Sequence, residues 1–399
     1  MLKRNLAIMW FSNFFIGGSL TMVMPFISLY IESFGVSSEE YVQHWSGITF
    51  AATFVTAFLF SPVLGRLGDR FGRKRILLML GLGMSLSLFL MGMVTTVWQL
   101  LALRLFMGFF AGSIPITQAF ISTQTPKEIA GKVLGTLQTG NITGTLLGPM
   151  IGGFLADSIG YADTFRGTSA IILISVLLIT MVKEFRVDIK FDEKINYSRL
   201  DVVQLIIRNP ALTAVLFISM LIQIALFSIQ PILALFVSDI HGPENLAFFS
   251  GLAFSAAGFG NLFMARKWGE LADKIGYIKI LIFLLLAGGV LYIPGMFVTE
   301  VWQLILIRFG LGVTIGGIIP VRMAYIRQEA PVSIQGEVLG YNQSLRFLGN
   351  IIGPILGGFL AASYGFPSVF LVTSILLLLS GFTLLVVTRK MHHSKNEVH

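Results

Sequence analysis

The chain has 399 residues, of which 55% are apolar and only 12% charged, and its mean hydropathy is +0.82. An ordinary soluble protein has about a quarter of its residues charged, so this class is excluded. The net charge of +8 is spread over short loops between apolar runs, which favours a membrane protein over one that binds nucleic acid. The absence of cysteine excludes disulfides, thiolate metal sites and cysteine catalysis.

Twelve runs are long and apolar enough to be membrane helices, which need about 20 mostly apolar residues. In chain order they lie near 6–30, 45–64, 76–96, 98–122, 133–156, 165–182, 210–238, 246–265, 278–298, 301–325, 337–361 and 367–388. The first run is too long for the core of a signal peptide and has no small-residue cleavage site, so we expect a retained span. The sequence therefore predicts an all-α membrane protein with both termini on the same side.

Basic residues indicate which side that is. Most of the 28 lysines and arginines lie at the termini or in the loops 66–75, 127–132, 183–208 and 266–279, or at position 327. The opposite loops, near 31–44, 239–245 and 299–300, are acidic or neutral. The positive-inside rule then places both termini in the cytoplasm.

The segment 183–208 is the only long polar stretch and divides the chain near its midpoint. We expect it to be a cytoplasmic linker between a bundle of residues 1–182 and a bundle of residues 209–399. An amphipathic segment that lies on the anionic inner leaflet and a plain flexible linker fit equally well.

The two halves of the chain are related in sequence. Three landmarks recur in the same order 204 to 206 residues later: Val-Trp-Gln-Leu with an arginine (97–104 and 301–308), Gly-Pro (148–149 and 353–354) and a proline followed by an apolar run (24–30 and 230–236). This predicts a duplicated six-helix bundle. Parallel halves of this kind are the layout of secondary transporters that alternate access.

A compact basic turn separates the second and third runs and has a weaker copy in the second half. Its defining residues are Gly65, Asp69, Arg70, Gly72 and Arg73, and the copy contains Asp273. The glycines permit a tight turn. Asp69 is suited to accept hydrogen bonds from the N-terminus of a neighbouring helix, which we expect to be that of the eleventh run, 337–361. Such a latch would be a two-state gating element. A basic loop that only sets topology would account for Lys74 and Arg75 but not for Asp69.

Glycines spaced four residues apart form a smooth stripe along the fifth run, with a counterpart in the eleventh. The residues are Gly140, Gly144, Gly148, Pro149 and Gly152, and Gly353 with Pro354. Such a stripe lets another helix pack backbone to backbone, and Pro149 can bend its helix. We expect this face to rock against the second half, at the helix of the eighth run, 246–265. Tight static packing is the alternative.

Arginines inside apolar runs are candidates for ligand binding, because each costs about 2.5–3.5 kcal/mol at a membrane-helix centre. Arg104 and its repeat partner Arg308 either face a cavity or pair with carbonyl groups. Arg346 lies near mid-membrane, so it binds a substrate anion or joins a network with Asn342 and Gln343. Arg322 and Arg327 lie nearer a helix end, where we expect them to reach lipid phosphate.

Other polar residues within the runs are further candidates for the cavity wall. They are Asn13, Gln118, Gln138, Asn141, Gln223, Gln230, Asn342 and Gln343, with Phe227 among the apolar neighbours. No acidic residue lies in the middle of a run, so Glu32 and Asp239, which end the first and seventh runs, are the first candidates for a proton carrier. Solvated helix ends are the favoured interpretation of both residues.

Over almost its entire length the chain resembles the major facilitator superfamily. The turn at 65–75 fits the signature of that superfamily at every defining position, and the glycine stripe at 140–153 resembles the motif of drug–proton antiporters with 12 spans. Arg104 with Gly108 and Gly112 resembles their helix-4 motif. Val-Met-Pro-Phe at 23–26 and Tyr-Asn-Gln-Ser at 341–344 are similar to MdtG-type multidrug efflux transporters.

The resemblance implies the major facilitator fold, with two pseudo-symmetric six-helix bundles around a cavity and a latch at Asp69 that closes the cytoplasmic side. It also implies proton-coupled export of small amphipathic drugs, and hence antibiotic resistance, by a monomer without cofactor or metal in a bacterial cell membrane. A lipid or glycolipid flippase and, with less support, a nutrient importer or facilitator are the alternatives. The sequence contains no phosphate-binding Gly-x-x-x-x-Gly-Lys loop, zinc motif or nucleophile elbow, so it predicts neither an ATP-driven pump nor an enzyme.

Overall fold

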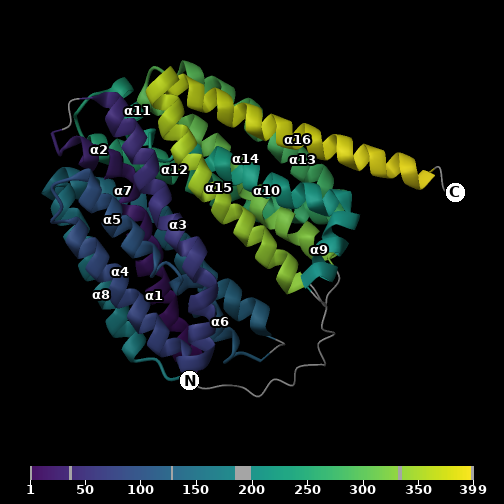
Figure 1. Cartoon of the computed structure of the whole chain (residues 1–399), viewed down its shortest axis with the longest axis horizontal. Helices are drawn as coiled ribbons and strands as arrows, with labels where there is room; N and C mark the ends of the chain where they lie inside the picture. The colour runs from purple at the N-terminus through teal and green to yellow at the C-terminus, as the bar shows by residue number, and fades with distance from the viewer. Residues whose placement is uncertain (1, 36–37, 127–128, 185–198, 331–334, 397–399) are drawn as a thin grey trace. The chain divides into compact units, whose positions relative to one another are not determined.

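The computed structural model describes residues 2–35, 38–126, 129–184, 199–330 and 335–396, and within these ranges all regular structure is helical (Figure 1). The first half contains α1 (Leu2–Met22), η1 (Met24–Phe26), α2 (Ile27–Glu32), α3 (Glu39–Phe71), α4 (Arg73–Met91), α5 (Val97–Gly108), α6 (Ser113–Ser122), α7 (Ala130–Ile159) and α8 (Tyr161–Thr180).

The second half contains α9 (Arg199–Arg208), α10 (Pro210–Ser228), α11 (Leu233–His241), α12 (Leu246–Ile275), α13 (Tyr277–Tyr292), η3 (Ile293–Phe297), α14 (Val301–Glu329), α15 (Gln335–Tyr364) and α16 (Phe366–Asn396). The short helix α9 lies within the predicted linker. The rest of that linker, 185–198, lies outside the described residues.

The predicted membrane spans agree with the helices. Eleven helical segments of the described chain are long and apolar enough to cross a membrane. They correspond to all the predicted runs except 45–64, which lies within α3. That helix has 33 residues but is not one of the eleven segments. The prediction of an all-α membrane fold is therefore confirmed.

Two repeat-related spans are interrupted at a proline. The first span, Leu2–Glu32, changes from α1 to α2 through a 3₁₀ turn that contains Pro25. The seventh, Pro210–His241, changes from α10 to α11 on either side of Pro231. A proline inside a helix removes one backbone hydrogen bond and clashes with the preceding turn, which favours a break at these two positions. Pro149, Pro320 and Pro354 lie inside continuous helices, so the proline alone does not decide it.

The chain divides into two compact units. One contains Met1–Lys190 with Pro231–Ser255, and the other contains Phe191–Gln230 with Ala256–His399. The segment 231–255, which holds α11 and the start of α12, thus belongs with the first six spans. The boundaries predicted from sequence, 1–182 and 209–399, remain a prediction.

Hydroxyl groups join helices inside each unit, at positions that the repeat relates. In the first unit, Ser85 and Ser169 on α4 and α8 share a hydrogen bond of 2.9 Å between their hydroxyl groups. In the second, Ser374 on α16 donates to the carbonyl of Gly289 on α13 at 2.7 Å. Membrane helices commonly associate through small residues and hydroxyl hydrogen bonds of this kind. The sequence repeat is thus also a repeat of contacts.

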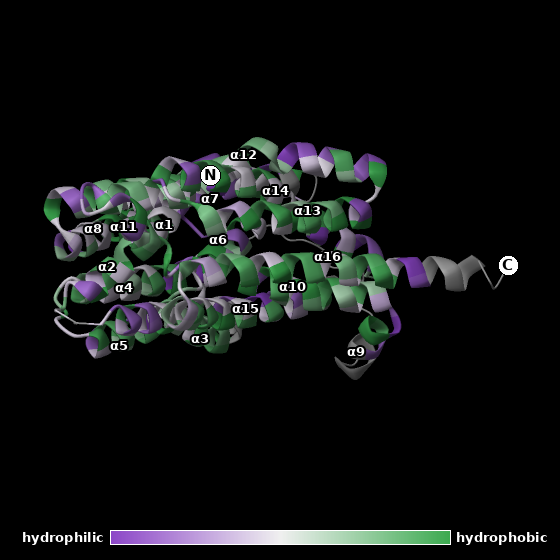
Figure 2. Cartoon of the chain, turned by 90° about the horizontal axis from the view of Figure 1, so that it is seen from above, coloured by the Kyte–Doolittle hydropathy of each residue, from purple (hydrophilic) through white to green (hydrophobic). Residues whose placement is uncertain are grey.

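Many large apolar side chains remain exposed on the spans, and Figure 2 shows hydrophobic residues along most of the helices. Leu177, Phe263 and Leu306 each expose more than half of their surface. Apolar cover of this extent is rare on soluble proteins. It is the surface expected of a protein whose surroundings are lipid.

Candidate gating and substrate sites

The basic turn at 65–75 is built on a glycine that no other residue replaces without strain. Helix α3 ends at Phe71, Gly72 has φ +92°, and α4 begins at Arg73. A positive φ is readily adopted only by glycine, and a Cβ atom at this position would lie 3.2 Å from a carboxylate oxygen of Glu184. The copy in the second half has the same geometry, because Gly276 has φ +108°.

Basic residues of the turn bind the ends of two neighbouring helices. Arg73 donates from its side chain to the carbonyl of Ala119 and to Thr123 Oγ1, both at the end of α6. Lys74 donates from Nζ to the carbonyls of Thr180 and Val182, just after α8, at 2.7 and 2.6 Å. The turn is therefore fixed within its own bundle, and the role of Lys74 goes beyond setting topology.

The structure describes the side chain of Asp273 in the second turn but not that of Asp69 in the first. The structure does not describe the side chains of Asp69 and Arg66. It also does not describe those of residues 331–337, which reach the start of the predicted partner helix, so the latch stays a prediction. Arg70 is exposed. In the copy, the exposed Asp273 accepts a hydrogen bond of 2.7 Å from the hydroxyl of Tyr277, four residues later on the next helix.

Four glycines of the α7 stripe pack against α1 of the same unit, so for these four the expected contact with the eighth run, α12, is wrong. A Cβ atom added at each of its four glycines would lie 1.9–2.5 Å from a backbone carbonyl oxygen of α1. The pairs are Gly140 with Trp10, Gly144 with Phe14, Gly148 with Gly18 and Gly152 with Met22. The sequence predicted close backbone contact at these glycines but not which helix makes that contact.

The second half repeats this arrangement. A Cβ atom at Gly353 would lie 2.7 Å from the carbonyl oxygen of Ile224, and one at Gly357 would lie 1.7 Å from that of Ser228. Both partners are on α10, the counterpart of α1. Both glycine motifs therefore make close backbone contacts between helices of the same half.

A different face of α7 contacts the start of α12. Ser255 donates to the carbonyl of Leu146 at 2.8 Å, and a Cβ atom on Gly251 would lie 2.2 Å from the carbonyl oxygen of Pro149. At the end of α7, the carboxylate of Asp157 accepts hydrogen bonds from the backbone N–H groups of Ala247 and Phe248. The predicted contact between the fifth and eighth runs, α7 and α12, therefore exists, and of the stripe residues it uses Pro149 and not the four glycines.

Two of the polar candidates in the first unit form a hydrogen-bonded pair, and two others, Asn13 and Asn141, lie apart from it. Gln118 donates to the side-chain oxygen of Gln138 at 2.7 Å, which links α6 to α7. Asn13 is fully buried on α1, and neither atom of its amide has a hydrogen-bond partner in the described structure. Asn141 lies against α1 at Gly17, where a Cβ atom would lie 2.6 Å from its amide oxygen.

The repeat partners Arg104 and Arg308 are both buried and both have partners. Arg104 donates from Nε to the carbonyl of Thr49 at 3.4 Å and lies over the ring of Phe50, 5.6 Å from its centre. Arg308 is hydrogen-bonded to the hydroxyl of Tyr292. These contacts favour the structural alternative for both residues, with carbonyl, ring and hydroxyl in place of a ligand.

Arg322 contradicts the expectation that it reaches lipid phosphate. Its side chain is 0% exposed, and none of its three guanidinium nitrogens has a hydrogen-bond partner in the described part of the chain. Arg327, five residues further on, is exposed as the expectation required. One signal was present in the sequence: Arg322 follows Arg308 by 14 residues, close to four helical turns, so both lie on nearly the same face of α14.

Arg346 on α15 lies near Arg322. It donates from Nη1 to the side-chain oxygen of Gln343 at 3.1 Å, while its buried Nε has no described partner. The two guanidinium groups are near enough for their charges to interact. The amide of Asn342, one turn before Arg346, contacts the sulfur of Met323 at 3.7 Å.

The remaining candidates of the second unit and the predicted proton carriers are placed as follows. Gln223 donates to Asn350 at 2.7 Å, and a Cβ atom on Gly353 would lie 3.1 Å from Cβ of Phe227. Gln230 is half-buried at the break between α10 and α11. Glu32 and Asp239 are exposed near the ends of α2 and α11, so their proposed role in proton transfer stays a prediction.

Comparison with known proteins identifies the family. A family model described as Major Facilitator Superfamily matches residues 9–266 and 215–399. The chain belongs to the major facilitator superfamily. It is therefore a transporter and not an enzyme, and the resemblance that the motifs indicated is confirmed.

Relatives within this superfamily match almost the whole chain. YuxJ, an MFS-type transporter of Bacillus subtilis (strain 168), is 50% identical over 96% of this chain and 98% of its own length. Multidrug resistance protein MdtG of Serratia proteamaculans (strain 568) is 41% identical over 95% of this chain and 92% of its own length. The prediction of a multi-pass membrane protein similar to MdtG-type transporters is confirmed.

Solved structures share the major facilitator fold at low sequence identity. The nucleoside transporter NupG has a TM-score of 0.78 at 15% identity and covers 97% of this chain and 99% of its own. A D-xylose–proton symporter has a TM-score of 0.77 at 14% identity and covers 96% of both chains. At this identity the likeness shows the fold alone.

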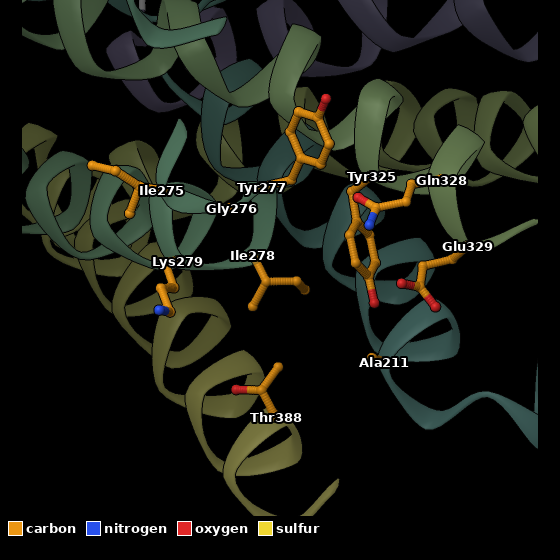
Figure 3. A pocket seen from close by; sticks show the side chains of 10 residues that line it. All are labelled: Ala211, Ile275, Gly276, Tyr277, Ile278, Lys279, Tyr325, Gln328, Glu329 and Thr388. Carbon is orange, nitrogen blue, oxygen red and sulfur yellow. The ribbon is translucent and has the colours of Figure 1, made fainter. Parts of the chain in front are cut away.

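A pocket of about 290 Å³ lies at helix ends of the second unit, between the start of α10, the junction of α12 and α13, the end of α14 and α16. Figure 3 shows Tyr325, Gln328 and Glu329 on one side and Ile278 and Lys279 across from them. Glu329 also accepts a hydrogen bond from Asn209 at 3.0 Å. No predicted substrate residue lines this pocket, so it is separate from the candidate substrate site of this major facilitator protein.

Proposed function

We propose that the protein exports small amphipathic molecules, drugs among them, across the bacterial cell membrane in exchange for protons. The observation that carries this proposal is the 41% identity to a multidrug resistance protein over 95% of the chain. The substrate would meet one side of the membrane at a time, by alternating access of the two halves. Both termini would lie in the cytoplasm, as the distribution of basic residues predicts.

Elements suited to gating support the proposal. Arg73 and Lys74 join the turn at 65–75, which contains Asp69, to the ends of α6 and α8 by hydrogen bonds. At the other end of the first bundle, Asp157 caps α12 from α7. A carboxylate at a helix N-terminus is a contact that breaks and re-forms as a unit, because it depends on alignment with the helix dipole.

Energy for export would come from an ion gradient, since the sequence has no ATP-binding loop. One charge that crosses 100 mV releases about 2.3 kcal/mol. Glu32 and Asp239 are the proposed proton carriers, because they are the acidic residues that end the two broken spans. A nutrient importer is the second candidate, favoured only by the likeness in fold to nucleoside and xylose transporters.

Transport into proteoliposomes with an imposed pH gradient tests this function. A cationic dye, an anionic dye and a labelled lipid would be offered separately. We expect movement of at least one dye that stops when a protonophore collapses the gradient. Dye movement that continues unchanged without a gradient would remove proton coupling, and movement of the lipid alone would replace export of drugs by lipid flipping.

A further inference from the structure

Arg322 has no hydrogen-bond partner among the described residues, although it is the largest of the fully buried side chains that the structure describes. Its guanidinium carries five N–H donors, and Nε, Nη1 and Nη2 all lack an acceptor in the described structure. A buried charge without partners is strongly unfavourable, so buried charges in proteins are normally paired. The two other buried arginines follow that rule, since Arg104 and Arg308 have a carbonyl and a hydroxyl.

The second arginine lies beside it on the adjacent helix. Met323 touches Asn342, which fixes the register of α14 against α15 at this level. Arg322 precedes Met323 by one position, and Arg346 follows Asn342 by one helical turn, on the same face. The two cations repel each other, and the Nε of Arg346 is also buried without a described partner.

No carboxylate neutralises this pair within the described residues. The ion pairs Asp163–Arg166 and Arg266–Glu270 lie elsewhere in the described structure. Glu329, the nearest acidic residue on α14, is seven positions from Arg322 and accepts a hydrogen bond from Asn209. The described side chains therefore include two neighbouring positive charges and no carboxylate that pairs with them.

The depth of the pair argues against lipid headgroups as the source. Arg322 precedes the end of α14 by seven residues, about 10 Å at 1.5 Å per residue. Arg346 follows the start of α15 by eleven residues, about 16 Å on the same scale. Arg322 is fully buried at this depth and therefore faces neighbouring helices and not the headgroup layer, while Arg346 is half-buried beside it.

We propose that Arg322 and Arg346 form a binding site for the anionic group of the transported substrate, a carboxylate, sulfonate or phosphate. This inference rests on the proposed export function and names the substrate class. Guanidinium groups bind such anions with two parallel hydrogen bonds, and two of them together also relieve their mutual repulsion. Met323, next to Arg322, is a flexible apolar neighbour suited to the aromatic or aliphatic body of an amphipathic anion.

Binding to the purified full-length protein in detergent tests the site. Two probes share one aromatic body: 5-(dimethylamino)naphthalene-1-sulfonate is anionic, and its sulfonamide is neutral. We expect the anion to bind about 10- to 100-fold more tightly, the range of one charge-assisted hydrogen bond. Arg322→Gln and Arg346→Gln should each remove most of this preference, while Arg327→Gln, an exposed arginine on the same helix, should keep it.

Thermal unfolding separates binding from a structural role. Without the probe, Arg322→Gln should unfold at the same temperature as the wild type or higher, because it removes an unpaired buried charge. The stabilisation by the sulfonate should be lost in this variant. A lower unfolding temperature without the probe, or an unchanged preference for the sulfonate, would overturn the proposal. If Arg322→Gln does not fold, Arg346→Gln carries the same test.

Transport of a cationic dye separates this inference from the function on which it rests. Dye export by the wild type and both glutamine variants, without any preference for the sulfonate, would overturn the anion site and leave the exporter intact. Selective sulfonate binding without transport of any probe would support the anion site and overturn export. The two proposals therefore fail in different measurements.

Discussion

The carboxylate of Asp157 accepts a hydrogen bond of 2.8 Å from the backbone N–H of Phe248 and thereby joins the end of α7 to the start of α12. Its other oxygen accepts from Ala247 at 3.1 Å. The first turn of a helix has N–H groups without helical partners, and here another span supplies the cap. This contact lies at the end of the first bundle opposite the turn at 65–75, because α7 and α3 run between the two ends.

Loss of the Asp157 cap should open this end of the protein more often. A helix cap is worth about 0.5–2 kcal/mol, so Asp157→Ala should raise the open population several-fold. The chain has no cysteine, so a single Ser250→Cys substitution gives a clean reporter of access to buried α12. We expect faster labelling of this cysteine by a membrane-impermeant maleimide in cells that carry Asp157→Ala.

The control for this experiment is Ser158→Cys, which is exposed beside the cap and should be labelled at the same rate with or without Asp157. Equal labelling of Ser250→Cys in both backgrounds would show that the cap does not control access.

A methyl group on the glycine stripe should destabilise the first bundle. In Gly144→Ala the new Cβ would lie 2.2 Å from the carbonyl oxygen of Phe14, so α1 and α7 must separate. Overpacking of this kind costs about 1–3 kcal/mol. The midpoint of thermal unfolding should fall by several degrees relative to the wild type.

Gly135→Ala is the matched control, because it lies on the same helix with no atom within 4 Å of the added Cβ. Alanine is the better helix former by about 1 kcal/mol, so this variant should be as stable as the wild type or more stable. Equal loss of stability in both variants would contradict backbone contact between α1 and α7.

Asp69→Asn should impair turnover more than binding if the predicted latch exists. The substitution keeps the shape of the side chain but removes the charge that interacts with a helix N-terminus, an interaction worth about 0.3–2 kcal/mol. We expect a severalfold lower maximal transport rate with nearly unchanged equilibrium affinity for the dye. Asp273→Asn is the comparison, since Asp273 accepts a hydrogen bond only from Tyr277 among the described contacts. Weaker affinity at a normal rate would contradict the latch.

The sequence predicted the features that depend on composition and local chemistry. The spans follow from runs of apolar residues. The breaks near Pro25 and Pro231 were not predicted, because a proline does not always interrupt a helix, as Pro149, Pro320 and Pro354 show. The stripe of glycines predicted close backbone contact. It did not reveal that α1 is the partner, because any helix can approach a smooth face.

Arg322 shows why site residues are harder to predict. Its distance from the end of α14 suits a side chain that reaches the headgroups, and only the packing of α14 against its neighbours turns it inward. The 14-residue spacing from Arg308 was a usable signal, since residues four turns apart share a face. The register that brings Arg346 near it depends on contact between Asn342 and Met323, which sequence alone does not supply.

Exchange of one proton for a monovalent anion would move two charges across the membrane, whereas exchange for a monovalent cation would move none. At 100 mV, negative on the cytoplasmic side, the anion exchange gains about 4.6 kcal/mol, twice the value for one charge. With equal pH on both sides, a potassium diffusion potential should therefore drive export of the naphthalene sulfonate but not of a cationic dye. Arg322→Gln should lose the sulfonate response while its dye export under a pH gradient persists. Sulfonate export that ignores the potential would contradict this stoichiometry, because a net movement of charge always responds to an applied voltage.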